Sequence, residues 1–390
     1  MITSKILITC PKGIPPFLKQ ELLSLDFPII TEQIAGVETE GTLDDTLRLN
    51  LHIRTGHRVL FLLQEFKAKS PDDLYQNLSG LRWEDFIPDD GYLCVTSSVD
   101  TLSISDSRFP TLRCKDAIVD RIRAKQGKRP DSGSERFRSV VHLYWKDDRV
   151  SVYLDTSGEP LSRRGYRKIP LGAPMQETLA AAVVLATGWD GGTNFINPMC
   201  GSGTLAIEAA LIGLNRAPGL LRNNFGFMHI KGFKEKLWND LREKAKQDAR
   251  KSVSGKIIAT DMAPDAVEAA KKNAATAGVE HLIEFGTCNF SDTVVPDGGG
   301  VIVLNPSYGE RMGEVTQLAE LYNGIGNYFK QKCKGYRGYV FTGNPMLAKQ
   351  VKLKPAKTFQ FFNSGIECRL LEYELYEGSR KSKKPKLPPS

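Results

Sequence analysis

The sequence lacks the features that would direct it to a membrane, a disulfide framework or a metal site. No apolar run approaches the ~20 residues that a bilayer-spanning helix needs. The seven cysteines are scattered, odd in number and include no Cys-x-x-Cys pair. The N-terminus shows no secretory cleavage pattern. These absences favour a cytoplasmic protein with reduced thiols, and they predict no metal centre and no membrane partner.

Two common nucleotide-binding patterns are also incomplete. The turn from Asn197 to Thr204 reads Asn-Pro-Met-Cys-Gly-Ser-Gly-Thr, between an expected strand and an expected helix. Ala206 stands where G-x-G-x-x-G needs its third glycine, and no Gly-Lys-Ser/Thr follows. A nicotinamide-dependent oxidoreductase is therefore disfavoured. Taken alone, the turn is either an ordinary strand-to-helix connection or a place where a ligand approaches the backbone.

Positive charge is in excess, with 53 Lys and Arg against 45 Asp and Glu, a formal net charge of +8. This balance favours an anionic partner such as nucleic acid. Arginines and lysines concentrate on and after an expected helix at 111–125, where a solvated helix face is an equal alternative, and again at 163–167. The residues that we expect to contact RNA are Arg108, Arg113, Lys115, Arg163, Arg164 and Arg167.

The pattern of apolar residues changes along the chain, and 390 residues suggest two or three domains. The first third predicts small α+β units, with strands at 5–10, 58–66, 92–99, 140–145 and 150–154 and helices at 17–23, 44–53, 71–78 and 111–125. From about Ala173 strands and helices alternate, which is typical of a doubly wound parallel sheet. A terminal hairpin at 358–362 and 368–375 adds an antiparallel edge. The fold class is thus α/β, with a Rossmann-like second part.

Asp261 ends the second expected strand of that sheet, where a carboxylate can accept both hydroxyls of a ribose. About 60 residues separate it from the glycine turn, against ~20 in a simple unit. The excess, residues 213–254, with an expected helix at 233–250, is an excursion from the fold. It is either a packing extension or a substrate contact.

The most specific pattern is Asn305-Pro306-Ser307-Tyr308-Gly309-Glu310-Arg311, directly after the apolar strand 300–304. In open α/β sheets ligands bind at the carboxyl ends of strands. An exocyclic amine on a base is a poor nucleophile, because its lone pair is delocalised into the ring. The Asn305 side-chain oxygen and the Pro306 carbonyl can each accept one N–H and aim the lone pair at a methyl donor. Tyr308 can stack on the extruded base.

These residues resemble the amino-methylating branch of the class I methyltransferases. Together with Leu161–Arg167 (Leu-Ser-Arg-Arg-Gly-Tyr-Arg), Ala173–Glu177 and the stretch Arg108–Asp120, they look like the bacterial THUMP-containing guanine-N2 methyltransferases of 23S ribosomal RNA. That family has also been labelled N6-adenine-specific DNA methylase. The resemblance covers nearly the whole chain. It implies an N-terminal α+β segment at 1–65, a THUMP-like RNA-binding domain at 66–160, a Rossmann-like methyltransferase domain at 161–378 and a disordered basic tail at 379–390.

The resemblance also implies roles for individual positions, with S-adenosyl-L-methionine as the cofactor and ribosomal RNA as the partner. Asp261 would hold the ribose of the cofactor and Asn289 its adenine, while Asn305, Pro306 and Tyr308 would hold the target base. The other residues expected to line the cofactor are Asn197, Pro198, Cys200, Gly201 and Gly203.

Three positions depart from the family pattern. Asn197 and Asn289 stand where Asp is usual, and Ser307 replaces a second proline. The two acceptors on the target amine survive, so we expect weaker preorganisation and retained activity. Two alternatives stay open: methylation of adenine N6 in RNA or DNA, which the motif alone does not separate from guanine N2, and a non-catalytic RNA-binding or ribosome-assembly protein with a decayed cofactor pocket.

Overall fold

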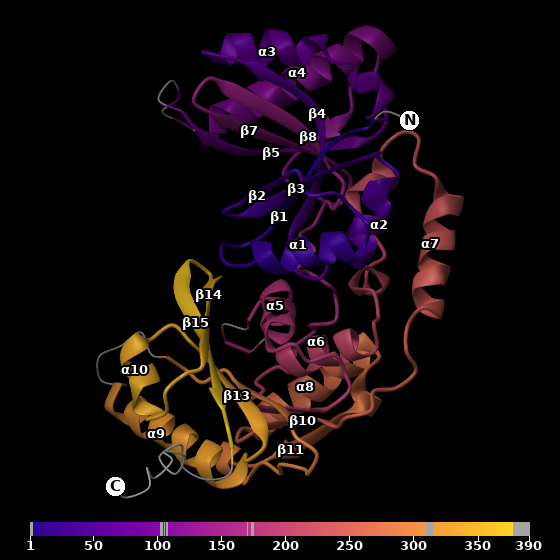
Figure 1. Cartoon of the computed structure of the whole chain (residues 1–390). Helices are drawn as coiled ribbons and strands as arrows, with labels where there is room; N and C mark the ends of the chain where they lie inside the picture. Colours follow the sequence, from indigo (N-terminus) through magenta and orange to yellow (C-terminus); the bar gives the residue numbers. More distant parts are fainter. Residues whose placement is uncertain are drawn as a thin grey trace, which may run out of the picture. The chain divides into compact units, whose positions relative to one another are not determined.

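The computed structural model describes residues 3–101, 104, 106, 108–169, 171–172, 175–308 and 315–376. It forms two compact units (Figure 1). The first unit comprises Met1–Arg167, Met175–Ala182 and Leu214–Lys251, and the second comprises Lys168–Pro174, Val183–Gly213 and Ser252–Ser390. Residues 309–311 of the Asn-Pro motif, Ala173 with Pro174, and the tail expected at 379–390 lie outside the described residues.

The first unit is built on an eight-stranded sheet in the order β2-β3-β1-β4-β8-β7-β5-β6. Strand β5 pairs in parallel with β6 and β7, and the other neighbours are antiparallel. The strands are β1 (Ser4–Thr9), β2 (Thr31–Gln33), β3 (Gly36–Gly41), β4 (Arg58–Lys67), β5 (Tyr92–Asp100), β6 (Asp131–Ser132), β7 (Ser139–Lys146) and β8 (Arg149–Asp155).

Four helices accompany this sheet: α1 (Pro15–Ser24), α2 (Asp45–His52), α3 (Pro71–Gly80) and α4 (Arg108–Gln126). Strand alternation sorts the side chains of β1, because Ile6 and Ile8 are fully buried while Leu7, between them, packs beside Leu60 and Leu62 on the other face. Helix α3 begins at a capping box in which Ser70 and Asp73 satisfy each other's backbone N–H groups. Strands β2, β3 and β6 were not predicted, because β2 is wholly exposed and β6 is only two residues long.

The excursion between the glycine turn and Asp261 belongs to the first unit. Its helix α7 (Glu235–Gln247) places Trp238 edge-on against Phe225 and Phe227, at centroid distances of 5.3 and 4.9 Å. The buried Arg222 donates to the carbonyls of Ser157, Glu159, Pro160 and Asn224. Residues 214–251 thus pack within the first compact unit, and the expected domain bounds, with 161–378 as one domain, stay predictions.

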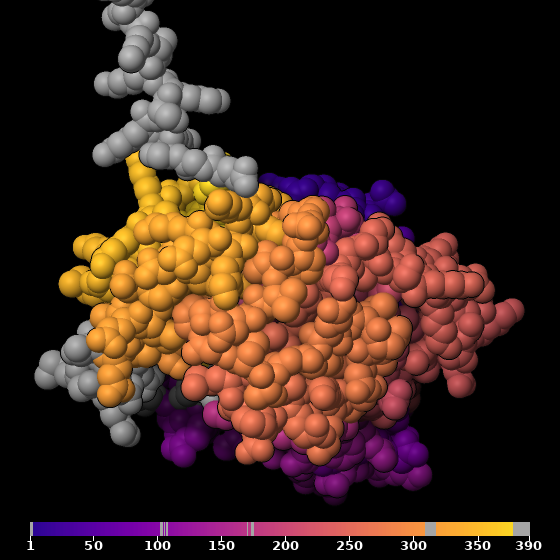
Figure 2. Space-filling model, turned by 90° about the horizontal axis from the view of Figure 1, so that it is seen from below, coloured from indigo at the N-terminus to yellow at the C-terminus, as the bar shows by residue number. Residues whose placement is uncertain are grey.

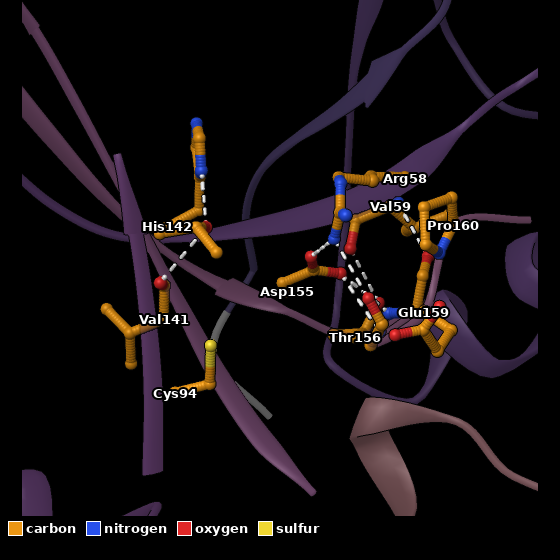
Figure 3. Close-up of polar contacts among 12 residues, drawn as sticks. Arg58, Val59, Cys94, Val141, His142, Asp155, Thr156, Glu159 and Pro160 are labelled. Carbon is orange, nitrogen blue, oxygen red and sulfur yellow. Dashed lines mark hydrogen bonds and ion pairs between the residues drawn. The ribbon is translucent and has the colours of Figure 1, made fainter. Parts of the chain in front are cut away.

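A buried ion pair fixes the end of the main sheet in the first unit (Figure 3). Arg58 of β4 pairs with Asp155 of β8, whose side chain is fully buried, and also donates to the carbonyl of Gly158 at 2.9 Å. Asp155 accepts in turn from the backbone N–H groups of Ser157 and Gly158. Burial raises the pKa of the Asp155 carboxyl, and Arg58 opposes that rise. The pair therefore holds the turn that follows β8 against β4.

The second unit carries a seven-stranded sheet in the order β11-β10-β9-β12-β13-β15-β14. Its first five strands are parallel, and β15 and β14 form the expected antiparallel edge. The strands are β9 (Asn194–Pro198), β10 (Ile257–Asp261), β11 (Ile283–Thr287), β12 (Gly300–Leu304), β13 (Tyr336–Thr342), β14 (Lys357–Asn363) and β15 (Ile366–Glu374). This confirms the predicted fold class, a Rossmann-like sheet with an N-terminal α+β region.

The helices of this part are α6 (Thr204–Gly213), α8 (Pro264–Ala277), α9 (Val315–Lys332) and α10 (Pro345–Gln350), and α5 (Glu177–Thr187) is divided between the two units. The chain leaves β9 toward β10 and leaves β12 toward β13, so strand order reverses between β9 and β12. Ligands of open α/β sheets bind at such a reversal. Within the described residues, no helix is long and apolar enough to cross a membrane.

Candidate functional site

The glycine turn is an open backbone cradle at the carboxyl end of β9. Met199, Gly201 and Gly203 all have positive φ values, of 61°, 53° and 83°. A side chain at Gly203 would meet the Cβ of Ala270 at 2.9 Å, so this glycine lets the turn pack against α8. A side chain at Gly201 would meet nothing within 4 Å. The turn therefore has free space beside its backbone at Gly201, where a ligand can lie.

Asn197 joins the two strands that flank the reversal. Regular pairing of β9 with β12 ends at Ile196 and Ile302. One residue later the Nδ2 of Asn197 donates to the carbonyl of Val303 at 2.9 Å. The Asn197 side chain is fully buried, and its Oδ1 has no hydrogen-bond partner in the described structure. A buried acceptor without a partner is costly, so this oxygen is suited to a donor on a bound ligand.

Asp261 lies across the turn at the end of β10. Its Oδ2 accepts the Gly201 N–H at 3.0 Å, and its Oδ1 accepts the Ala263 N–H at 3.0 Å. A carboxylate oxygen accepts more than one hydrogen bond, so both retain capacity for ribose hydroxyls. Asn289 follows β11, is exposed, and uses its Oδ1 to cap the Phe290–Asp292 turn through Ser291. Its side-chain NH₂ therefore remains as a donor.

The Asn-Pro loop begins where β12 ends, on the same edge of the sheet as the glycine turn. Pro306 is buried and Asn305 is half-buried. No described residue hydrogen-bonds to the Asn305 side chain or to the Pro306 carbonyl, so both acceptors are available. Because Asn197 contacts Val303, two residues before Asn305, the glycine turn and the loop are linked directly.

Three contacts anchor the loop from its carboxyl side. The Tyr322 hydroxyl of α9 donates to the Ser307 carbonyl at 3.4 Å, and Asn344 Nδ2 reaches the Tyr308 carbonyl at 3.4 Å. The Tyr308 hydroxyl accepts from Asn363 Nδ2 at 3.1 Å. Tyr308 is thus held at its hydroxyl end, and a base can contact only the part of its ring that stays exposed.

Two ionisable groups near the site, the Cys200 thiol and the Tyr322 hydroxyl, stay neutral. Burial, with Asp261 nearby, raises the pKa of the Cys200 thiol to about 12, so this cysteine acts as a small apolar wall of the turn. Burial also raises the pKa of Tyr322, which keeps its hydroxyl a donor. No cluster of His, Cys, Asp or Glu that could hold a metal occurs in the described part of the chain.

One residue that the sequence analysis missed is Met262, which follows Asp261 and is 74% exposed. This exposed apolar side chain directly after Asp261 is available to contact an aromatic ring of a ligand. Its sequence position directly after the strand-terminal acid was the available signal.

The cations predicted to contact RNA are mostly engaged within the protein. Arg108 pairs with Asp106, Arg113 with Asp72, Lys115 with Asp116 and Arg163 with Glu159. Arg113 also lies over the ring of Tyr75, at 4.3 Å from the centroid. Such exposed pairs are weak and can exchange for phosphate contacts. These four residues stay predictions.

Two of the predicted RNA contacts need correction. Arg164 is 1% exposed and donates to the carbonyls of Arg54 and Leu161. Arg167 is 15% exposed, pairs with Glu177 and donates to the Met175 carbonyl at 2.6 Å. Both guanidinium groups stabilise the fold of the first unit, and neither is presented to a phosphate. Three arginines within five residues suggested an RNA contact, but spacing does not reveal which side chains turn inward.

Three family profiles match consecutive parts of the chain. They are the RlmL ferredoxin-like domain at residues 5–60, the THUMP domain at 68–155 and the RMKL-like methyltransferase domain at 164–372. The last covers more than half of the chain.

Similar proteins cover almost all of the chain. A ribosomal RNA large subunit methyltransferase K/L of Syntrophotalea carbinolica is 39% identical over 383 residues, 96% of this chain and 54% of the relative. The chain spans about half the length of such K/L relatives. A Synechocystis protein named as a candidate RNA methyltransferase is 33% identical over 368 residues, 94% of this chain and 96% of that protein.

Solved structures agree in fold. The crystal structure of SMU.472, a candidate methyltransferase complexed with SAH, has a TM-score of 0.87 at 26% identity and covers 97% of this chain and 100% of that one. A Listeria monocytogenes protein described as an N6-adenine-specific DNA methylase has a TM-score of 0.86 at 30% identity, covering 96% of both chains. The chain therefore belongs to the family of RMKL-like methyltransferases, in which the methyltransferase domain follows RlmL ferredoxin-like and THUMP domains.

Proposed function

We propose that this chain transfers a methyl group from S-adenosylmethionine to the exocyclic N2 amine of a guanine in 23S ribosomal RNA. One observation carries the proposal. Two acceptors without a described partner, on Asn305 and Pro306, follow directly after β12. Asn197 links this strand to the open glycine turn. A ribosomal RNA substrate goes with a cytoplasmic location.

The residues of the turn fit the cofactor. Asp261 is positioned to accept the ribose hydroxyls, and the free space at Gly201 admits the ligand close to the backbone. The unpartnered Asn197 Oδ1 suits the ammonium group of the amino-acid portion. When bound, S-adenosylmethionine supplies a methyl group activated by its sulfonium charge. SMU.472, which is similar along its whole length, was solved with SAH.

The Asn-Pro loop orients the amine. Asn305 Oδ1 and the Pro306 carbonyl each accept one N–H, which localises the nitrogen lone pair and directs it away from the loop. The new N–C bond forms as the methyl–sulfur bond breaks, and the nitrogen then releases one proton to water. Tyr308 limits the movement of the base, because Asn363 holds the Tyr308 hydroxyl and Asn344 holds the Tyr308 main-chain carbonyl. Oriented acceptors of this kind act through electrostatic preorganisation.

RNA is favoured as the substrate by the THUMP match at 68–155 and by the relatives named as ribosomal RNA methyltransferases. The K/L relatives are about twice as long as this chain, so the proposal concerns the activity of the part that they share with it. The description of the Listeria monocytogenes structure as an adenine methylase supports adenine N6 as a second candidate.

The test is Asn305→Ala measured with ribosomal RNA that lacks the modification. Loss of one oriented acceptor predicts a fall in rate of roughly 10²–10³. Circular dichroism and calorimetric binding of S-adenosylmethionine serve as controls for folding and the cofactor site. Near-normal turnover in a folded variant would remove Asn305 from the mechanism.

Mass spectrometry of nucleosides from the methylated RNA identifies the base. N2-methylguanosine is the expected product, and N6-methyladenosine would establish the second candidate. If the wild-type chain shows no calorimetric binding of S-adenosylmethionine, the alternative of a non-catalytic RNA-binding protein is favoured.

A further inference from the structure

Four lysines lie close together in the sequence near the end of the second unit. Lys349 lies in α10, Lys352 and Lys354 follow it, and Lys357 begins β14; all four are exposed. Within the described residues, no ion pair or side-chain hydrogen bond involves any of these four ammonium groups. In contrast, Arg108, Arg113, Lys115 and Arg163 all pair with carboxylates. Four neighbouring positive charges without carboxylates repel one another, and an anion would relieve that repulsion.

A cavity of about 460 Å³ opens beside this lysine segment. It lies between α10 and the hairpin β14–β15, which Figure 1 shows at the edge of the sheet. Its buried wall is apolar and includes Leu371 and Tyr373, and Lys349, Glu367 and Arg369 line its exposed side. In Figure 2 the yellow segments, which include this hairpin, lie at the surface.

Tyr373 gives the cavity an unusual polar feature. The residue is 1% exposed, and none of the described residues hydrogen-bonds to its hydroxyl. Burial raises its pKa to about 12, so it remains a neutral phenol that can donate. The hydroxyl itself is not sealed from solvent, and because the residue lines the cavity it is placed to donate to a ligand there.

The cavity is adjacent to the Asn-Pro loop. Gly343 lines the cavity, and a Cβ on Gly343 would lie 3.2 Å from the Tyr308 ring. Thr342, also in the wall, shares a hydrogen bond of 2.8 Å with the Tyr322 hydroxyl that supports Ser307. A strand of RNA whose target base lies at Tyr308 therefore passes close to the cavity with its next nucleotides.

The chemistry of the lining matches a nucleobase on a phosphate chain. Pockets for small ligands are mostly apolar, span roughly 300–1,000 Å³ and carry a few placed polar groups. Here the apolar wall can contact the face of a base. The Tyr373 hydroxyl, the Glu367 carboxylate and the Arg369 guanidinium can meet its polar edge, while lysines suit phosphates as point charges.

We propose that this cavity takes a base that flanks the target in a single-stranded segment of RNA, and that Lys349, Lys352, Lys354 and Lys357 bind the phosphates of that segment. The inference rests on the proposed function for the identity of the target, but its test measures RNA binding separately from methyl transfer.

The first arm of the test is Lys352→Gln/Lys354→Gln/Lys357→Gln in the full chain, with fluorescein-labelled oligouridylate as the probe. Anisotropy titrations at several salt concentrations give the slope of log Kd against log [salt]. Losing three phosphate contacts lowers that slope by about 2, since each contact on a single strand contributes ~0.7. The matched control Lys256→Gln/Lys271→Gln/Lys272→Gln removes equal charge elsewhere in the same unit. Equal slopes for wild type and both variants would overturn the proposal.

The second arm fills the cavity with Ala348→Leu, which adds apolar volume that cannot stack on a base. We expect about tenfold weaker binding of oligouridylate, as for the loss of one base contact, and unchanged binding of an abasic oligomer that keeps the phosphates. The lysine variant should weaken both probes. Equal affinity of Ala348→Leu and wild type for oligouridylate would exclude the base from the cavity.

Failure of this proposal is distinguishable from failure of the proposed function. Calorimetric binding of S-adenosylmethionine should be the same for wild type, the lysine variant and Ala348→Leu, because none of the changed residues contacts the glycine turn. If the lysine variant lowers the salt slope as predicted but the wild-type chain methylates no RNA, the binding surface stands and the proposed reaction is wrong.

Discussion

Two groups of charged residues, one in each compact unit, differ in whether the protein neutralises them. In the first unit Arg113 pairs with Asp72 at the surface and Arg58 pairs with the buried Asp155. In the second unit the lysines at 349–357 have no described partner, and the acceptors of Asn305 and Pro306 are also unpaired. The comparison teaches that the number of charges in a segment says little about its availability to a ligand. Availability depends on whether a carboxylate or carbonyl of the protein lies within reach.

The largest expected effect is on the free energy of unfolding of the first unit, and it tests whether the internal charges there are structural. Arg58→Met leaves Asp155 buried without its counter-charge, so the free energy of unfolding should fall by about 3–5 kcal/mol. Urea denaturation of the full chain measures this fall. The companion variant Arg58→Met/Asp155→Leu, which removes both charges, should recover much of the loss. If Arg58→Met were as stable as wild type, the internal charges of this unit would not be structural.

A smaller effect is a pH dependence confined to the first unit. Burial lowers the pKa of both His57 and His142 from 6.5 to about 4, with neighbouring arginines adding to the shift. Since the unfolded chain binds protons more readily than the folded one between these values, stability should fall as pH drops from about 6.5 toward 4. The loss is at most about 3 kcal/mol for each histidine.

Chemical denaturation at a series of pH values checks this dependence, and His142→Gln is the diagnostic variant. Removing His142 should make the decline in stability shallower, while His57, together with His52 and His229, whose pKa values burial also lowers, keeps the rest of it. The Thr96 hydroxyl, which contacts His142 Nδ1 at 2.9 Å, can pair with the glutamine amide. An unchanged slope in His142→Gln would assign the acid sensitivity to other groups.

The smallest expected effect concerns the exposed pairs. Arg113→Gln breaks the pair with Asp72 and the contact with the Tyr75 ring, and should cost less than about 1 kcal/mol of stability. We also expect its effect on oligouridylate affinity to be smaller than that of the lysine variant. A larger loss of affinity for Arg113→Gln would reverse the comparison and make the THUMP domain the stronger RNA-binding surface.

Much of the second unit could be predicted because its strands are short apolar runs with polar residues directly after them. The span of β12 was predicted without error, and the ends of β9, β10 and β12 carry Asn197, Asp261 and Asn305. Parallel topology then brings those ends to one edge, so sequence order was enough to group them. Helix α10 was missed, because its six residues are too few to show a helical period.

The parts that could not be predicted depend on contacts between distant segments. The orphaned Oδ1 of Asn197, the inward turn of Arg164 and the capture of the Tyr308 hydroxyl by Asn363 each need three-dimensional neighbours. The route of residues 214–251 is the clearest case. The sequence left packing and substrate contact open, and only the structure shows that Arg222 of this segment donates to the carbonyls of Ser157 and Pro160.

That route constrains how the chain is made. The polypeptide crosses between its two units five times, at residues 167/168, 174/175, 182/183, 213/214 and 251/252. Synthesis proceeds from the N-terminus, so Arg58 and Asp155, which pair with each other, emerge early. Arg222 and Trp238 of the same unit emerge only after β9 and α6 of the other unit. The first unit therefore completes its core only when Lys251 has left the ribosome. No single cut in the polypeptide therefore separates the two units intact.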